Sequence, residues 1–116
     1  MIAGIASALS GIRTGGRMLN VAAHNIANAQ TEGFIRTRAL PVESSAGGVT
    51  LTLDKEIQSA SPIFSNEDSS IILEGSNVDL GEEIISHLQA VHLIEANLAS
   101  VRMQDKILGS LLDITE

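Results

Sequence analysis

The sequence predicts a mainly α-helical fold with a small β part. We expect long N- and C-terminal helices packed as an antiparallel, coiled-coil-like hairpin, with a short β-rich and loop-containing middle. Apolar residues recur at heptad spacing near both ends, both prolines lie between those regions, and aromatic residues make up only 2% of the chain. An aliphatic composition favours helices packed along their lengths, because cores and ligand pockets usually draw much of their buried area from aromatic side chains.

The 116 residues suit a single structural unit. We divide it into a heptad-patterned helix over 1–30, a β-rich or loop insert over 31–76, and a second heptad-patterned helix over 77–116. Four arginines against one glutamate give 1–40 a charge of +3, whereas two basic against seven acidic residues give 77–116 a charge of −5. These opposite charges favour pairing between the ends, within one chain or between copies.

The first helix is predicted from about Ile2 to Ala29. Its apolar and small residues follow each other at alternating steps of 3 and 4, which is typical of a helix seam that packs against another helix. A helix of this length measures about 40 Å at the usual rise of about 1.5 Å per residue. The seam consists of Ile2, Ile5, Leu9, Ile12, Gly16, Leu19, Ala23 and Ile26.

Glycines weaken this helix. Gly4, Gly11, Gly15 and Gly16 each cost about 1 kcal/mol relative to Ala in a helix interior. Gly4, Ala8, Gly11 and Gly15 also share one helix face. These residues either simply destabilise a surface helix or let another helix approach closely. We favour close approach, and we expect the segment to order only when a partner helix receives it.

A β-hairpin is predicted in the middle region. Val49–Leu53 alternates apolar and polar residues, as a half-buried strand does. Leu40–Val42 precedes a turn with Gly47 and Gly48, and it is the expected partner strand. Pro41 confines that strand to a sheet edge, because proline lacks the N–H that an inner strand must donate.

The rest of the middle region carries weaker signals. Ile71–Leu73 is a third strand candidate, and 65–70 is rich in Ser, Asn, Asp and Glu, which indicates an exposed loop. A region this small buries too little apolar surface to be stable alone. We therefore expect it to lean on the helices.

The second helix is predicted to begin after Asp79. Asp79 is a good N-cap, Glu82 completes a capping-box-like pair with it, and Glu83 adds negative charge to the first turn. The helix extends to about Ile114, roughly 50 Å. Its seam consists of Ile84, Leu88, Val91, Ile94, Leu98, Val101, Asp105, Leu108 and Leu112.

Composition and motifs argue against several function classes. The chain has no cysteine, so disulfides, thiolate metal sites and a cysteine nucleophile are excluded. It contains no Gly-x-Ser-x-Gly, Walker or dinucleotide-binding loop. The arginines form no basic stripe with aromatic platforms, which makes a poor nucleic-acid footprint. We predict no enzyme activity, no catalytic residues, no cofactor and no nucleic-acid partner.

Two histidine–glutamate pairs lie on the second helix. Glu83 and His87 share a face at i, i+4, as do His92 and Glu95 at i, i+3. Such pairs can hold a metal where helices from two copies meet, or they form solvated contacts that add about 0.2–0.5 kcal/mol each. We favour solvated contacts and predict no metal site.

Neither a cleaved leader nor a membrane span is expected. The N-terminal run Met1–Leu9 lacks a basic region before it and is too short for a secretory signal. No stretch reaches the roughly 18 apolar residues of a membrane span. We therefore expect no direct membrane insertion, and any export must follow a route that reads something other than a cleaved leader.

The most unusual local string ends the first helix. Asn28 can cap helix carbonyls, and the segment from Thr31 to Gly33 then turns the chain. An ordinary helix exit explains these residues, but it does not explain the polar Asn25 in the last turn of the seam. The complete string reads Ala-His-Asn-Ile-Ala-Asn-Ala-Gln-Thr-Glu-Gly-Phe over residues 23–34.

The segment 8–34, which contains this string, resembles the N-terminal signature of the bacterial flagellar rod and hook protein family, which centres on Asn-Ile-Ala-Asn followed by Thr-x-Gly-Phe or Thr-x-Gly-Tyr. The segment 76–114 resembles that family's C-terminal signature in the same order and spacing. Together the two stretches cover over half the chain. The matching residues are Asn25, Ile26, Ala27, Asn28, Thr31, Gly33, Phe34, Asn77, Val78, Asp79, Leu80, Glu82, Glu83, Ala96, Asn97, Leu111 and Leu112.

The resemblance implies a structural subunit whose terminal helices pair as a coiled coil in the inner tube of a helical filament. It also implies export through the flagellar type III apparatus without a cleaved leader, and assembly into the periplasmic rod of the basal body. The expected partners are other copies and other rod or hook subunits. The short middle favours a proximal-rod-like member.

We expect the helix seams to form the assembly interface. The residues concerned are Ile2, Ile5, Leu9, Ile12, Leu19, Ile26, Ile84, Leu88, Val91, Leu98, Val101, Leu108 and Leu112. A soluble helical-hairpin adaptor or export-chaperone module that does not polymerise is the alternative. Self-association that increases with concentration separates the two.

Overall fold

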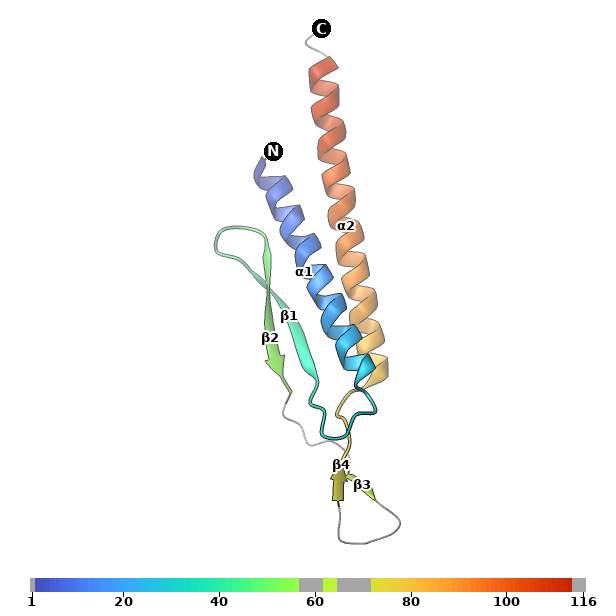
Figure 1. The fold of residues 1–116 in the computed structure, drawn as a ribbon. Helices are drawn as coiled ribbons and strands as arrows, with labels where there is room; N and C mark the ends of the chain where they lie inside the picture. The colour runs from blue at the N-terminus through green and yellow to red at the C-terminus, as the bar shows by residue number, and fades with distance from the viewer. Residues whose placement is uncertain (1, 57–61, 65–71, 114–116) are drawn as a thin grey trace.

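The computed structural model describes residues 2–56, 62–64 and 72–113. Two long helices, α1 (Ile2–Ala27) and α2 (Leu80–Asp113), run antiparallel side by side, so that α1 begins near the end of the molecule where α2 finishes (Figure 1). Two small antiparallel sheets connect them along the chain. The predicted mainly α-helical class with a small β part is therefore confirmed. No described helix is long and apolar enough to cross a membrane.

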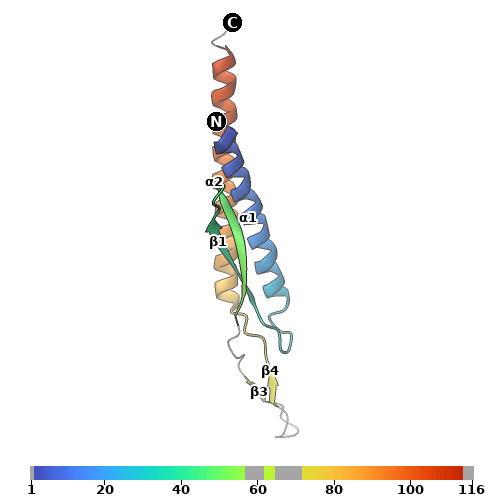
Figure 2. The same cartoon turned by 90° about the vertical axis from the view of Figure 1, so that its left-hand side faces the viewer.

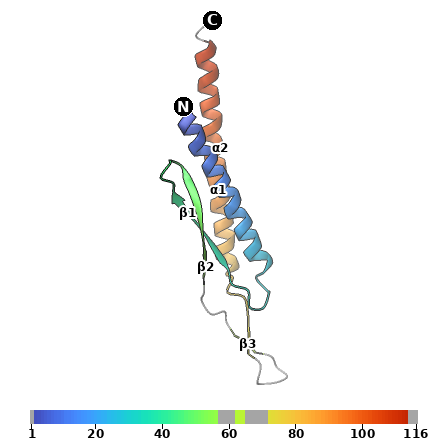
Figure 3. The ribbon, with the colours of Figure 1, turned by 60° about the vertical axis from the view of Figure 1, so that its left-hand side comes forward.

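The first sheet is the predicted hairpin. β1 (Thr37–Glu43) pairs with β2 (Val49–Lys55), with Pro41 opposite Leu51. The turn between them needs backbone that favours glycine, since Gly47 and Gly48 have φ of 87° and 81°. The hairpin lies along α1 on one side of the helix pair, as the turned views show (Figures 2 and 3). The prediction that the middle leans on the helices is thus confirmed for this hairpin.

A second, shorter sheet lies beyond the end of the helix pair where α1 finishes and α2 begins (Figure 1). It pairs β3 (Pro62–Phe64) with β4 (Ile72–Glu74). β4 confirms the third strand candidate from Ile72 onward, whereas its partner β3 was not predicted, because three residues beginning with proline show no alternation. The loop expected over 65–70 lies outside the described residues.

Asp79 caps α2 as predicted. Its Oδ1 accepts hydrogen bonds from the N–H groups of Gly81 (2.8 Å) and Glu82 (3.1 Å), which satisfies donors that have no partner inside the helix. The Glu82 side chain differs from the prediction. It accepts a hydrogen bond from Arg36, so it forms a long-range ion pair in place of a capping box.

Small residues make the contact between α1 and α2. A Cβ atom built on Gly15 would lie 2.6 Å from Cγ1 of Ile94 and 3.1 Å from the carbonyl oxygen of Ala90. A Cβ on Gly4 would lie 3.0 Å from Nε2 of Gln104. Only glycine lets the two backbones come this close, because a real Cβ does not approach other atoms to 2.6 Å. The interpretation that the glycines permit close helix approach is confirmed.

The contact surface differs from the predicted seams. On α1, each residue that lies against α2 directly precedes a residue of the predicted seam. These packed and buried residues include Ala8, Gly11, Gly15, Met18, Ala22 and Asn25. Seam residues such as Leu9 and Ile26 are 42% and 37% exposed. On α2, Ala90 is fully buried whereas Leu88 is 52% exposed. Packing follows the small residues because they allow the shortest distance between the helices.

The apolar core is small and lies where three elements meet. Met18 of α1, Leu51 of β2 and Ala90 of α2 form its buried centre. Leu19, Ala39 and Leu93 pack around them and remain partly accessible. The hairpin is therefore held to the helices by apolar burial in the middle of its length, as well as by the polar contacts at its ends described below.

Gly15 and Gly16 offer a matched test of the helix contact. Gly16→Ala has open space around its Cβ, so we expect it to raise the free energy of unfolding by about 0.5–1 kcal/mol through helix propensity. Gly15→Ala should lower it by about 1–2 kcal/mol, because overpacking against Ile94 outweighs the propensity gain. Urea denaturation followed by circular dichroism measures both. Equal stabilisation by the two substitutions would contradict the close approach.

Candidate functional site

The turn end of the hairpin is fixed to α1 by two hydroxyl groups. The Val49 N–H donates to Oγ of Ser10 (3.0 Å), and Oγ1 of Thr14 donates to the Val49 carbonyl oxygen (3.2 Å). The N–H and the carbonyl oxygen of Val49 thereby both have hydrogen-bond partners on α1. Gly48 sits against Ser10, where a Cβ would collide with the hydroxyl. The hairpin tip therefore has one position along α1.

The base of the hairpin is fixed by Asn25. This residue is completely buried, and its amide forms a pair of hydrogen bonds with the backbone of Thr37. Nδ2 donates to the Thr37 carbonyl oxygen (2.8 Å), and Oδ1 accepts from the Thr37 N–H (3.1 Å). The polar residue in the last turn of the seam, which a simple helix exit left unexplained, thus docks the start of β1 on α1.

The other members of the N-terminal motif build the turn between α1 and β1. Nδ2 of Asn28 donates to the His24 carbonyl oxygen (2.9 Å), and Oγ1 of Thr31 donates to Oδ1 of Asn28 (3.3 Å). Gly33 adopts a φ of 65°. The Phe34 ring then lies edge-on to the His24 ring, with centroids 5.5 Å apart. The predicted capping by Asn28 and the predicted turn are both present.

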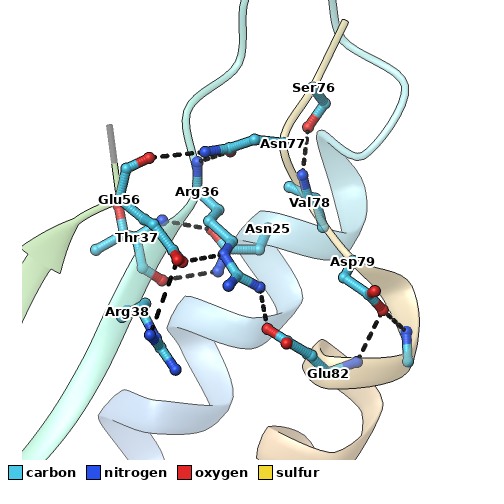
Figure 4. A network of polar contacts seen from close by, with 11 residues as sticks. Asn25, Arg36, Thr37, Arg38, Glu56, Ser76, Asn77, Val78, Asp79 and Glu82 are labelled. Carbon is cyan, nitrogen blue, oxygen red and sulfur yellow. Dashed lines mark hydrogen bonds and ion pairs between the residues drawn. The ribbon is translucent and has the colours of Figure 1, made fainter. Parts of the chain in front are cut away.

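Asn77 joins the C-terminal motif to this turn (Figure 4). Its Oδ1 accepts from the Arg36 N–H (2.7 Å), its Nδ2 donates to the Glu56 carbonyl oxygen (2.7 Å), and its own N–H donates to the Phe34 carbonyl oxygen (3.3 Å). The two motifs lie far apart in sequence, yet they meet in one polar junction. This junction sets where the hairpin leaves α1 and where α2 begins.

Arg36 is the charged centre of the junction. Its side chain is only 9% exposed and forms ion pairs with Glu56 at the end of β2 and with Glu82 in the first turn of α2 (Figure 4). The hydrogen bond with Glu56 raises the pKa of Arg36 above its ordinary value. The same bond holds the pKa of the Glu56 carboxyl below its usual range, against the opposing effect of burial. The opposite charges of the two chain ends therefore meet within one chain.

A second feature is an exposed apolar surface on the side of the helix pair away from the hairpin. On each helix, the residue that precedes one packed against the other helix faces the hairpin side. Ser10 and Thr14 of α1 bind Val49 on the hairpin, and Glu82 of α2 binds Arg36 just before β1. Since successive helix residues point about 100° apart, the residue after each contact position faces the opposite side. We call this surface the open apolar face; it consists of Ile5, Leu9, Ile12, Ile26, Ile84, Val91 and Leu98, with Leu88 one turn after Ile84 at its outer edge and the half-buried Leu19 at its inner edge, beside the core.

The open apolar face contains most residues of the predicted assembly interface. Leu9, Leu88 and Leu98 are 42%, 52% and 37% exposed, and Ile84 is 54% exposed. Their side chains are therefore available to a partner. Both helices contribute to the same face because they run antiparallel. In such a pair, the residue that follows a packed residue points to the same side of the pair on either helix.

The remaining predicted residues lie elsewhere. Val101 is half-buried on the stripe that continues the contact with α1, and nothing is described of the Ile2 side chain. α2 has 34 residues against 26 in α1, and Leu108 and Leu112, which are 37% and 70% exposed, lie on the part that extends past α1. Of the motif residues, Ala27, Leu80 and Ala96 are exposed, whereas Asn97 packs against Gly11.

One of the two histidine–glutamate pairs is the expected solvated contact. His92 Nδ1 lies 3.5 Å from Glu95 Oε2, and both side chains are more than 60% exposed. The expectation for Glu83 is wrong, because this residue is only 6% exposed. Among the described residues, no group of three or more potential ligands is arranged to hold a metal ion.

Comparisons with known proteins assign no family. No model of a known protein family matches the chain, and no curated protein does. The inference of function therefore depends on the residues and their geometry. Sequence reasoning missed Arg36 and Glu56 as site residues. The charge difference between the ends was the available signal, but it does not identify which residues meet, since the pairs span 20 and 46 positions.

Asn25→Ala tests the docking of the hairpin. Loss of two hydrogen bonds leaves the Thr37 backbone groups unsatisfied, so we expect the free energy of unfolding to fall by about 2–4 kcal/mol. Asn20→Ala removes an exposed amide from the same helix and should change stability by less than about 0.5 kcal/mol. Urea denaturation gives both values. A similar small effect for both variants would rule out the proposed role of Asn25.

Acid titration tests the ion pair of Glu56. Because the folded pKa is lowered from the ordinary value of 4.5, Glu56 stabilises the fold above that value, and this contribution is lost as the pH falls through the folded pKa. Glu56→Gln should therefore be less stable than wild type at pH 7 and lose less stability on acidification below about 4.5. Glu43→Gln is the control. Parallel acid limbs for wild type and Glu56→Gln would contradict the assignment.

Proposed function

We propose that this protein is a structural subunit of the bacterial flagellar basal-body rod, which assembles into a helical tube through its terminal helices. The open apolar face is the single observation that carries the proposal. Both helices contribute large aliphatic side chains to it, and Ile84 and Leu88 are more than half exposed. An exposed apolar surface to which two helices contribute large side chains is typical of an interaction site.

Burial of this face supplies the driving force for assembly. Burying one large aliphatic side chain contributes about 1.5–3 kcal/mol. A contact between this face of one copy and a different surface of the next is heterologous, so it propagates along a helix of subunits and does not close after two copies. In the tube, each subunit would contribute its antiparallel helix pair as a coiled-coil-like inner element, with the hairpin on the outer side.

The polar junction supports the same proposal. The residues that resemble the two family signatures, Asn25 to Phe34 and Asn77 to Glu82, hold the hairpin on the side of the helix pair away from the open face. Other rod or hook subunits, as well as further copies, are the proposed partners. In this proposal, export through the flagellar type III apparatus would bring the chain to the periplasmic rod.

Concentration-dependent self-association tests the proposed function. We expect light scattering of the purified protein to rise steeply with concentration, and electron microscopy to show tubular polymers. A species of constant mass, either a monomer or a closed dimer, would contradict the proposal and support a non-polymerising adaptor or chaperone.

Leu88→Glu and Leu98→Glu test the surface that drives assembly. A charge in the open apolar face prevents burial worth about 1.5–3 kcal/mol per leucine, so the concentration at half-assembly should rise by about 10- to 100-fold for each substitution. Leu53→Glu is the matched control, since Leu53 is 50% exposed on the hairpin. Circular dichroism checks that all three variants fold. Equal effects of the face and hairpin substitutions would exclude the open apolar face as the interface.

A further inference from the structure

A second exposed apolar surface lies on α2, about 140° around the helix from the residues that α2 contributes to the open apolar face. Ile85, Met103 and Ile107 are 56%, 60% and 46% exposed, and they share one helix face because their spacings are close to whole numbers of helical turns. The hairpin packs mainly on α1 and leaves this side of α2 uncovered. We call this surface the back stripe; it consists of Ile85, Gln89, Ala96, Met103 and Ile107.

The back stripe holds no acidic or basic side chain, although it is exposed. His92 lies at its margin, where it forms an ion pair with Glu95. The charged side of an exposed helix normally faces solvent, so an exposed stripe without charge indicates a surface that a partner covers. The charged residues of α2 between Ile85 and Ile107 all lie off the stripe, and they are Glu95, Arg102, Asp105 and Lys106.

The two helices differ in how many of their sides are apolar. The side of α1 that points away from α2 is polar, with Arg13, Arg17 and Asn20 all exposed. α2 instead has apolar residues on its contact with α1, on the open apolar face and on the back stripe. A helix that is apolar all round is stable when it is covered all round. α2 therefore presents a surface for a neighbour on each of its two free sides.

The open apolar face of a second copy matches the back stripe in length and in chemistry. The back stripe measures about 33 Å along α2, and the part of the open apolar face between Ile5 and Ile26 on α1 measures about 32 Å. Both surfaces are aliphatic, and neither contains a charged residue. Ala96 lets a neighbour approach closely, and the flexible Met103 adapts to the shape of the side chains it meets.

Symmetry favours this pairing over a contact between two like surfaces. Two open apolar faces packed on each other would close after two copies and leave both back stripes exposed. An open apolar face packed on a back stripe covers both kinds of surface, and the same contact can then repeat from copy to copy.

We propose that the back stripe of α2 receives the open apolar face of a second copy. Each α2 is then covered by its own α1 and by a neighbour on either side. The inference rests on the self-assembly proposed above and identifies the surface that the open apolar face contacts.

Mixing two assembly-defective variants tests the pairing. Leu9→Glu/Leu98→Glu carries charges only in the open apolar face, and Met103→Glu/Ile107→Glu carries them only in the back stripe. Each variant alone should raise the concentration at half-assembly by about 100-fold or more. In a mixture, the intact face of one binds the intact stripe of the other, and the product stops at two copies because both remaining surfaces are charged. Sedimentation and native mass spectrometry should find a 1:1 heterodimer.

Leu40→Glu/Val42→Glu is the control. These residues are 44% and 41% exposed on the hairpin, outside both surfaces. The control should assemble within threefold of wild type, and it should not form a complex that stops at two copies when it is mixed with either defective variant.

Photo-cross-linking supplies a direct readout. The chain has no cysteine, so Met103→Cys gives a single attachment point for a benzophenone maleimide. We would mix this labelled protein with ¹⁵N-labelled wild type, let the mixture assemble and irradiate it. Mass spectrometry should place the links to the ¹⁵N copy on residues of the open apolar face or their direct neighbours.

Each outcome decides a different point. Wild-type protein that does not self-associate at any concentration contradicts the proposed function and this inference together. Wild-type protein that assembles, while Met103→Glu/Ile107→Glu assembles equally well, overturns only the inference. A mixture that stays monomeric or grows beyond two copies, or cross-links confined to the partner's own back stripe, also overturns it. If a glutamate variant fails to fold by circular dichroism, the cross-link from Met103→Cys decides.

Discussion

The close approach of α1 to α2 across Gly4, Gly11 and Gly15 is the contact on which the other features of the structure depend. Because these positions lack a Cβ, the side chains of Asn97 and Ile94 come directly against the α1 backbone. Ile94 is one of the few large aliphatic residues on the contact itself, and many of the others, such as Leu9 and Ile84, remain exposed beside it. If large residues made the helix contact, the leucines and isoleucines of the open apolar face would be buried between α1 and α2. No open apolar face would then remain for a partner.

The hairpin determines which side of the pair stays open. It is held along α1 at three levels: Ser10 and Thr14 at its tip, Leu51 against Met18 in its middle, and Asn25 at its base. Arg36 then ties the base of the hairpin to the first turn of α2. One side of the helix pair is therefore covered by polar and apolar contacts together, and the opposite side carries the open apolar face.

Local signals in the sequence predicted much of this fold. Asp79 caps α2, and Val49–Leu53 forms a strand, because capping and alternation involve neighbouring residues only. Heptad spacing identified both helices, but it did not identify which stripe packs inside the chain, since the small and large stripes lie one residue apart on the same helix. The large stripe attracted the prediction because apolar size is easier to recognise than the space left by a glycine.

The candidate site was less predictable, because its contacts are long-range. Asn25 was conspicuous as a polar residue in an apolar pattern, yet its partner is the Thr37 backbone, which has no sequence signature. Glu83 was assigned to solvent because a glutamate in a first helical turn usually stabilises the helix from the surface. Its burial follows from its place two turns before Ala90, on the stripe of α2 that packs against α1, and hence from a long-range contact.

In the proposed assembly, the glycine contact would also couple folding to self-association. Each interior glycine costs α1 about 1 kcal/mol of helix propensity, so α1 alone is a weak helix, and contact with α2 offsets this cost. The open apolar face needs α1 and α2 side by side, so this proposed contact surface does not exist in the unfolded chain. A subunit exported unfolded would therefore acquire its assembly surfaces only after its two ends have met.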